Sequence, residues 1–235
     1  MAMKTMSNAS RKLSIIPRAV FKVLIFSFFI AILGGAMSVP FHYETQTLWY
    51  KTGAYKVMLR TGQLAGLLAL VLIVLQIFLS IRGRLLEDLF SGKNLMRWHK
   101  TNGIIIAFAA VSHAILVLAP EGINNLPIEK KYWPEWIGAF LLLLILFIVV
   151  SSHFRSVLKL DYTLWRNLHK PMGYLVVFLV LIHVLFVSGS FEQGTPKALL
   201  LSVFTGLTLL VATVKTIRWN SKVKKEEDQP NKHLL

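Results

Sequence analysis

The sequence predicts an all-α, polytopic membrane protein: a bundle of six transmembrane helices. Of its 235 residues, 55% are hydrophobic and only 16% are charged, whereas soluble domains average about 45–50% apolar and about 25% charged residues. Six apolar stretches are each long enough to cross a hydrocarbon core of about 30 Å. The net charge of +15 is distributed as a topology signal, so no nucleic-acid partner is expected.

The predicted spans differ in how continuous their apolar runs are. The second and fourth are almost unbroken, and the third and fifth contain histidines. The first resembles a signal peptide in its basic flank, but its apolar run is long and no small-x-small cleavage site follows it, so we interpret it as an anchor. In chain order, the six spans are expected at about 20–39, 62–81, 102–119, 136–152, 170–188 and 198–216.

These spans are expected to form one membrane domain, residues 20–217. Short connections between them leave no room for a second domain. A basic segment, 1–19, precedes this domain. The charged segment 218–235 follows it and lacks hydrophobic periodicity, so we expect a disordered tail.

Basic residues predict the orientation of the bundle. The side with both termini and the segments 82–100 and 153–170 carries 20 Lys and Arg, and the opposite side carries 6. The richer side is expected to be cytoplasmic, which places both termini inside. We therefore expect a multi-pass protein of a cell membrane, with a bacterial inner membrane favoured, and with lipid around the helices.

The chain has no cysteine. This excludes disulfides, cysteine-based zinc or iron–sulfur sites, thiol catalysis and covalent haem attachment through a C-x-x-C-H motif. Any metal must be held by histidine, carboxylate, methionine or a cofactor.

Two equally spaced histidine pairs are the main functional signal. His99 and His113 lie on the third span, and His169 and His183 lie on the fifth. Fourteen residues come within about 40° of four full helical turns and rise about 21 Å, so each pair shares one helix face at two depths. Because both helices run in the same direction, His99 can meet His169 near the cytoplasm, and His113 can meet His183 nearer the outside. Facing bis-imidazole pairs are what two b-type haems require as iron ligands.

The sequence around the inner histidines supports this interpretation. Gly103 and Gly173 follow His99 and His169 by four residues, one turn deeper on the same face, where a flat macrocycle needs a missing side chain. Farther along, this face is apolar, whereas Phe108 and Phe178 lie about 180° away and are expected to contact lipid or pack. The apolar positions between the pairs are Ile106, Ala110, Val176 and Val180.

Polar side chains near the expected sites admit two interpretations. Lys100 and Lys170 could bind the propionates of the inner haem, or could simply flank the spans on the positive side. Lys56 and Arg60 could likewise bind the propionates of the outer haem, or could belong to a solvated face. Serine hydroxyls at 112, 151 and 152 are candidate partners for a second imidazole N–H. Gln63 and Gln76 on the second span are expected to bond neighbouring segments rather than to line a quinone pocket. We interpret His153, at the inner end of the fourth span, as an interfacial residue.

Two other functions remain open. A proton-coupled transporter could use the same histidines without haem, although helices broken by Gly or Pro in two repeated halves are mostly absent. A structural membrane subunit could also have retained the histidines without activity. A haem-binding subunit would be coloured when purified. A transporter without haem would be colourless, and a structural subunit would be inactive.

The histidine pairs and the residues next to them resemble the ferric reductase-like transmembrane domain. The resemblance rests on the two pairs, on Trp98-His99-Lys100-x-x-Gly103 and on Leu168-His169-Lys170-Pro171, and extends over about 20–217. The family contains the membrane parts of ferric reductases and NADPH oxidases, and the haem-binding subunit of a bacterial methionine sulfoxide reductase. The resemblance implies that His99 and His169 bind an inner haem, and that His113 and His183 bind an outer one.

Its implied activity is transmembrane electron transport by an oxidoreductase component. Full-length ferric reductases continue into FAD- and NAD(P)H-binding domains, but no G-x-G-x-x-G fingerprint occurs in this sequence. We therefore expect no FAD or NAD(P)H site here, and a separate flavoprotein or membrane quinol as the electron donor. The acceptor would lie on the outer side; a periplasmic reductase anchored by this subunit is the alternative.

Overall fold

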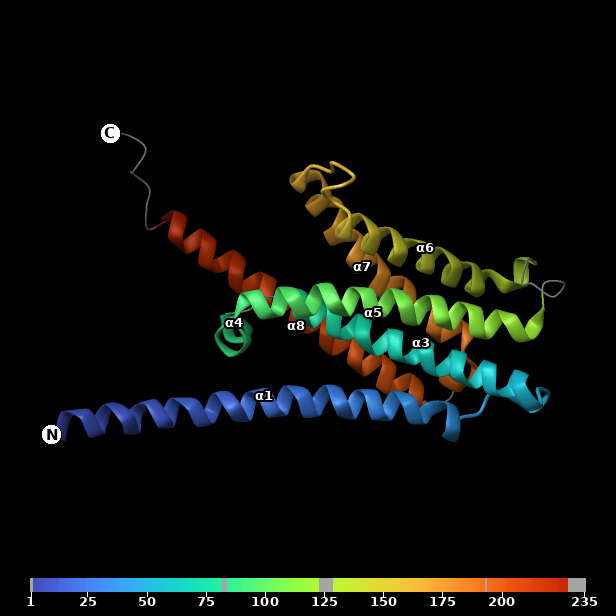
Figure 1. Ribbon diagram of the computed structural model, residues 1–235, viewed down its shortest axis with the longest axis horizontal. Coiled ribbons are helices and arrows are strands. Elements are labelled where there is room, and N and C mark those ends of the chain that lie inside the picture. Colours follow the sequence, from blue (N-terminus) through green and yellow to red (C-terminus); the bar gives the residue numbers. More distant parts are fainter. Residues whose placement is uncertain (1, 82–83, 123–128, 193, 228–235) are drawn as a thin grey trace.

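Long helices dominate the computed structural model, which describes residues 2–81, 84–122, 129–192 and 194–227 (Figure 1). Within these residues, six helices are long and apolar enough to cross a membrane, and no β-strand occurs. The predicted fold class, an all-α polytopic bundle, is therefore confirmed. The six long helices are α1 (Ala2–His42), α3 (Gly53–Ser80), α5 (Gly92–Leu118), α6 (Trp133–His153), α7 (Tyr162–Val187) and α8 (Gly194–Glu227).

Several helices extend beyond the spans expected from hydropathy. α3 begins at Gly53 and α5 at Gly92, about nine or ten residues before their apolar runs, because polar residues at the membrane interface can continue a helix at little cost. α8 continues to Glu227, so the first part of the segment expected to be a disordered tail is helical. Residues 228–235 of that segment lie outside the described residues.

Short helices connect the long ones. α2 (Gln46–Trp49) lies between α1 and α3, and α4 (Arg84–Phe90) precedes α5. Single 3₁₀ turns flank α5, α6 and α7, and Pro134 occupies the first turn of α6, where a missing N–H has no cost. The 3₁₀ turns are η1 (Ala119–Glu121), η3 (Lys130–Tyr132) and η4 (Gly189–Phe191).

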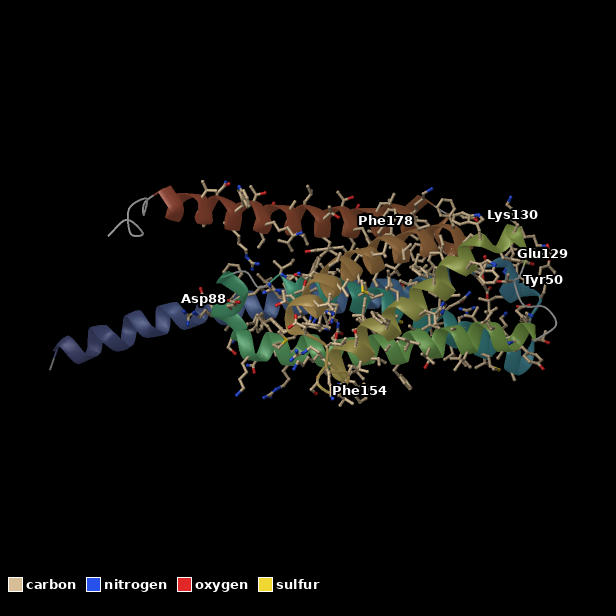
Figure 2. The ribbon with its side chains drawn as sticks, turned by 90° about the horizontal axis from the view of Figure 1, so that it is seen from above. Tyr50, Asp88, Glu129, Lys130, Phe154 and Phe178 are labelled. Carbon is tan, nitrogen blue, oxygen red and sulfur yellow. The ribbon has the colours of Figure 1, made fainter. Side chains whose placement is uncertain are left out.

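The two ends of the bundle differ in what they contain. α1 begins and α8 ends at the same end of the molecule, where α4 and the α6–α7 connection also lie (Figure 1). Tyr50, Glu129 and Lys130 lie at the opposite end from Asp88 (Figure 2). This grouping of segments is the one that the distribution of basic residues predicted.

The core of the bundle surrounds α3. This helix contributes more buried residues than any other described helix, because it packs closely on α5 and also contacts α1 and α7. The predicted face between the histidine pairs lies in this core, since Ile106, Val176 and Val180 are buried there. Phe108 is 75% exposed and Phe178 is 60% exposed. The expectation that both phenylalanines point away from the histidine face is confirmed.

Candidate functional site: two facing histidine pairs

α5 and α7 bring the four histidines together as two pairs. The ring centroids of His99 and His169 are 6.3 Å apart, and those of His113 and His183 are 6.4 Å apart. α5 packs most extensively on α3, and α7 on α6. Each histidine-bearing helix therefore has a supporting helix behind it, and the rings meet between the two helix pairs.

The outer pair is held by backbone carbonyls of the supporting helices. His113 Nδ1 lies 2.9 Å from the carbonyl oxygen of Gly62 on α3. His183 Nδ1 lies 3.0 Å from the carbonyl oxygen of Pro134 on α6. A carbonyl oxygen can only accept a hydrogen bond, so Nδ1 carries the proton in both rings. In a neutral imidazole this leaves the lone pair on Nε2, the atom available to a metal ion.

Within the inner pair, His169 is held by a side chain. Its Nδ1 lies 3.2 Å from the hydroxyl oxygen of Ser152, and this hydroxyl donates its proton to the carbonyl oxygen of Ile148 at 2.5 Å. The serine oxygen therefore accepts from Nδ1–H of His169, which again leaves Nε2 with the lone pair. Ser152 is thus the serine partner that sequence alone left among three candidates.

A polar network on α3 and α5 surrounds His99. The amide nitrogen of Gln76 lies 3.2 Å from His99 Nε2 and donates to the His99 carbonyl oxygen at 3.0 Å. Asn102 fixes the amide orientation because its Nδ2 donates to Gln76 Oε1 at 2.7 Å and to the Leu72 carbonyl at 2.9 Å. An amide nitrogen is a donor, so His99 Nε2 accepts. All four histidines therefore carry a lone pair on Nε2, and in His99 this lone pair accepts a hydrogen bond from the Gln76 amide.

This donor set fits a haem better than a bare metal ion. Two metal–imidazole bonds of about 2 Å each, together with the half-widths of two rings, span roughly 6 Å between ring centroids, close to the 6.3 and 6.4 Å observed. Within the part of the chain that the structure describes, no group of three or more His, Asp or Glu side chains could hold a metal ion. A protein-bound bare metal usually needs more ligands than two, whereas a porphyrin supplies four nitrogens itself.

The two predicted glycines differ in their surroundings. A Cβ atom on Gly173 would meet no atom within 4 Å, and one on Gly103 would lie 3.4 Å from the Gln76 amide nitrogen. The glycines in tight contact with histidines are instead Gly66 and Gly138, on the supporting helices. By hydropathy, both glycines are ordinary residues of a membrane span. The one sequence signal that could have singled out Gly66 is the Gly62-x3-Gly66 spacing, which is typical of close helix packing.

Lysines lie beside the inner pair, whereas the outer basic residues have protein partners. Lys100 and Lys170 are exposed at the inner ends of α5 and α7. On the outer side, Arg60 forms an ion pair with Glu44 at 2.5 Å and donates to the Pro40 carbonyl at 2.9 Å. Lys56 lies 3.7 Å from the same carboxylate. The Glu44 carboxylate thus pairs with both Arg60 and Lys56 and offsets one of their two positive charges.

Other polar and aromatic residues complete the surroundings. Gln63 donates to the Thr45 hydroxyl at 3.2 Å, so the expectation that Gln63 and Gln76 bond neighbouring segments is confirmed. The Trp165 ring lies 4.7 Å from the His169 ring and is tilted by 32°, a contact that sequence reasoning missed. His153 is exposed and its ring contacts Phe154 at 4.9 Å, as expected for an interfacial residue.

Comparison with known proteins identifies the central part of the chain. Residues 65–170 match the family described as the ferric reductase like transmembrane component. No curated protein and no solved structure matches the chain. The match includes three of the four paired histidines and extends from α3 to the first turns of α7. Together with six membrane-spanning helices, it supports a membrane electron-transfer component. Residues 65–170 of this multi-pass chain are therefore similar to the ferric reductase like transmembrane component family.

Proposed function

We propose that this protein is a transmembrane electron-transfer subunit that holds two b-type haems between α5 and α7. The observation that carries the proposal is the pair of facing imidazoles at each of two depths, 6.3 and 6.4 Å apart. His99 and His169 are the proposed inner iron ligands, and His113 and His183 the outer ones. When bound, the two haems supply one-electron chemistry across the membrane.

The remaining residues of the chain position and insulate these ligands. Hydrogen bonds at Nδ1 fix the ring orientation and raise the basicity of Nε2, and this support is present at His113, His169 and His183. The buried side chains of Ile106, Val176 and Val180 exclude water between the two depths. Gly103 and Gly173 leave room beside the inner ligands, and Lys100 and Lys170 are the proposed partners of anionic propionates.

The distribution of charge orients the proposed transfer. Both chain termini lie on the cytoplasmic side in this proposal, since that side carries most of the Lys and Arg residues. The proposed donor is a separate flavoprotein or membrane quinol at the inner pair. The proposed acceptor lies at the outer pair and is either a small oxidant or a periplasmic protein. The proposed location is a bacterial inner membrane.

Absorption spectroscopy with a haem-to-protein ratio tests the proposal. The full chain, purified in mild detergent, is expected to give a sharp α-band on reduction with dithionite and about two haems per chain. Replacement of any one paired histidine by alanine should remove one haem, because that site would then keep only one of the two imidazoles that would hold the group. His153→Ala is the matched control, since that ring is exposed and lies outside both pairs. A chain that stays colourless when haem is supplied refutes the proposal.

A further inference from the structure

The two outer histidines rest on their supporting helices in the same way. The ring of His113 lies against Gly66 and bonds the carbonyl of Gly62; the ring of His183 lies against Gly138 and bonds the carbonyl of Pro134. In both cases the carbonyl belongs to the residue four positions before the glycine. Residues i and i+4 lie one above the other on a helix, so a missing side chain at i+4 uncovers the carbonyl of residue i. We call each of these arrangements a glycine seat.

A side chain at either glycine would collide with the histidine ring. A Cβ atom on Gly66 would lie 2.7 Å from Nδ1 and 2.9 Å from Cε1 of His113, and one on Gly138 would lie 2.8 Å from Nδ1 of His183. For both glycines, the three nearest atoms all belong to the imidazole ring. A ring can rotate away at small cost to the fold, but it then leaves its carbonyl acceptor. The expected damage is therefore to ring placement rather than to folding.

Helix packing alone does not account for Gly66. Its neighbour in the Gly62-x3-Gly66 motif does serve packing, since a Cβ on Gly62 would lie 3.1 Å from the backbone nitrogen of Val117 on α5. Gly66 meets the imidazole of His113 instead. The missing side chains of the two glycines thus have separate roles, since that of Gly62 makes room for the α5 backbone and that of Gly66 makes room for the imidazole of His113.

The inner histidines are supported differently at the equivalent positions. On α6, Ile148 and Ser152 follow Pro134 and Gly138 by fourteen residues, the same interval that separates His169 from His183. On α3, Gln76 follows Gly62 by fourteen residues and meets His99. Side chains contact the inner rings, Ser152 at Nδ1 of His169 and Gln76 at Nε2 of His99, whereas the outer rings bond backbone carbonyls of the supporting helices. The glycine seats are therefore a feature of the outer pair, and the two sites can be perturbed separately.

We infer that Gly66 and Gly138 are positioning residues for the outer haem, holding Nε2 of His113 and His183 toward a shared iron. This inference rests on the proposed function. Replacing either glycine by alanine is expected to remove the outer haem, so that the haem-to-protein ratio falls by about half, while the inner haem keeps its spectrum and potential. Electron paramagnetic resonance should show the loss of one of two low-spin signals.

Two controls separate positioning from a general structural effect. Gly206→Ala on α8 is a matched substitution, because a Cβ there would meet nothing within 4 Å, and it should leave both haems in place. In a His113→Ala chain, which has no ring at that seat, adding Gly66→Ala should change the haem ratio no further. A further loss in that background would show that Gly66 supports the fold, and would overturn the inference.

The outcomes also distinguish this inference from the proposed function. Wild-type protein with about two haems, and glycine variants that keep both with unchanged spectra and potentials, overturn the inference alone. Wild-type protein that takes up no haem refutes the proposed function and this inference with it. Selective loss of one haem in Gly66→Ala and Gly138→Ala, with retention in Gly206→Ala, supports both.

Discussion

Ser152 links the imidazole of His169 to the backbone of α6. Its hydroxyl oxygen lies 3.2 Å from Nδ1 of His169 and donates to the carbonyl of Ile148 at 2.5 Å. One hydroxyl thus fixes the proton on Nδ1 and turns Nε2 toward the opposite helix. His183 lies fourteen residues after His169 on α7. Its Nδ1 bonds the Pro134 carbonyl directly, without an intervening side chain. The two rings on one helix therefore have different electrostatic support.

Ser152→Ala is expected to raise the reduction potential of the inner haem. Loss of the hydrogen bond makes Nε2 of His169 a weaker donor, which destabilises the oxidised iron relative to the reduced iron. A net hydrogen bond of about 0.5–1.5 kcal/mol corresponds to roughly 20–60 mV for one electron. Potentiometric titration followed at the α-band measures the shift. Ser151→Ala is the control, since that hydroxyl donates to the same Ile148 carbonyl, and equal shifts in both variants would contradict the prediction.

Gly62→Ala is expected to destabilise the bundle. The new methyl group would lie 3.1 Å from the backbone nitrogen of Val117 and 2.9 Å from its Cγ2 atom, and a helix backbone cannot rotate away. Forcing α3 from α5 should cost about 1–3 kcal/mol. Thermal unfolding in detergent, compared with Gly206→Ala, measures the loss. Equal stability of the two variants would show that α3 and α5 tolerate a wider separation.

Asn102→Ala is expected to destabilise the protein through an unsatisfied polar group. Asn102 is 6% exposed, and its amide donates to Gln76 Oε1 and to the Leu72 carbonyl. Truncation leaves the partly buried Gln76 oxygen without this donor, at a cost of about 1–3 kcal/mol. A double-mutant cycle with Gln76→Leu checks this explanation, because the two losses should not add. Full additivity would mean that the two side chains act independently.

Asp161 is expected to stabilise the start of α7 in a pH-dependent way. Its carboxylate accepts the backbone N–H of Leu164 at 2.9 Å, and this hydrogen bond lowers the pKa of Asp161 below its usual 3.8. Because the folded pKa is the lower one, the stabilisation is fully present above the usual pKa and is lost as the pH falls through the folded value. Hydrogen exchange at the Leu164 amide should accelerate in Asp161→Ala at neutral pH.

Asp161→Asn is the informative control for this cap. Asparagine keeps an acceptor oxygen and remains a good N-cap, so exchange at Leu164 should stay slow and should lose its acid dependence. Fast exchange in Asp161→Asn would show that the negative charge, rather than the hydrogen bond, holds the first turn of α7.

Local patterns in the chain were sufficient to predict the fold class of the protein and the helix faces that carry its histidines. Twenty-residue apolar runs can satisfy their backbone groups in lipid only as helices, so hydropathy was sufficient to predict six spans. The helical repeat was sufficient to place His99 and His113 on one face of α5, and His169 and His183 on one face of α7. Both arguments are local, since they depend only on residues along a single helix.

The support of each imidazole depends on contacts between different helices, which no single span could predict. The contacts of His113 with Gly66, of His183 with Gly138 and of His169 with Ser152 join different helices, whose rotation and depth are set by packing around α3. Each of these glycines acts by lacking a side chain, because this exposes the backbone carbonyl of the residue four positions earlier to the imidazole. Such a role exists only once a second helix has placed a ring against it, so no periodicity within one span could predict it.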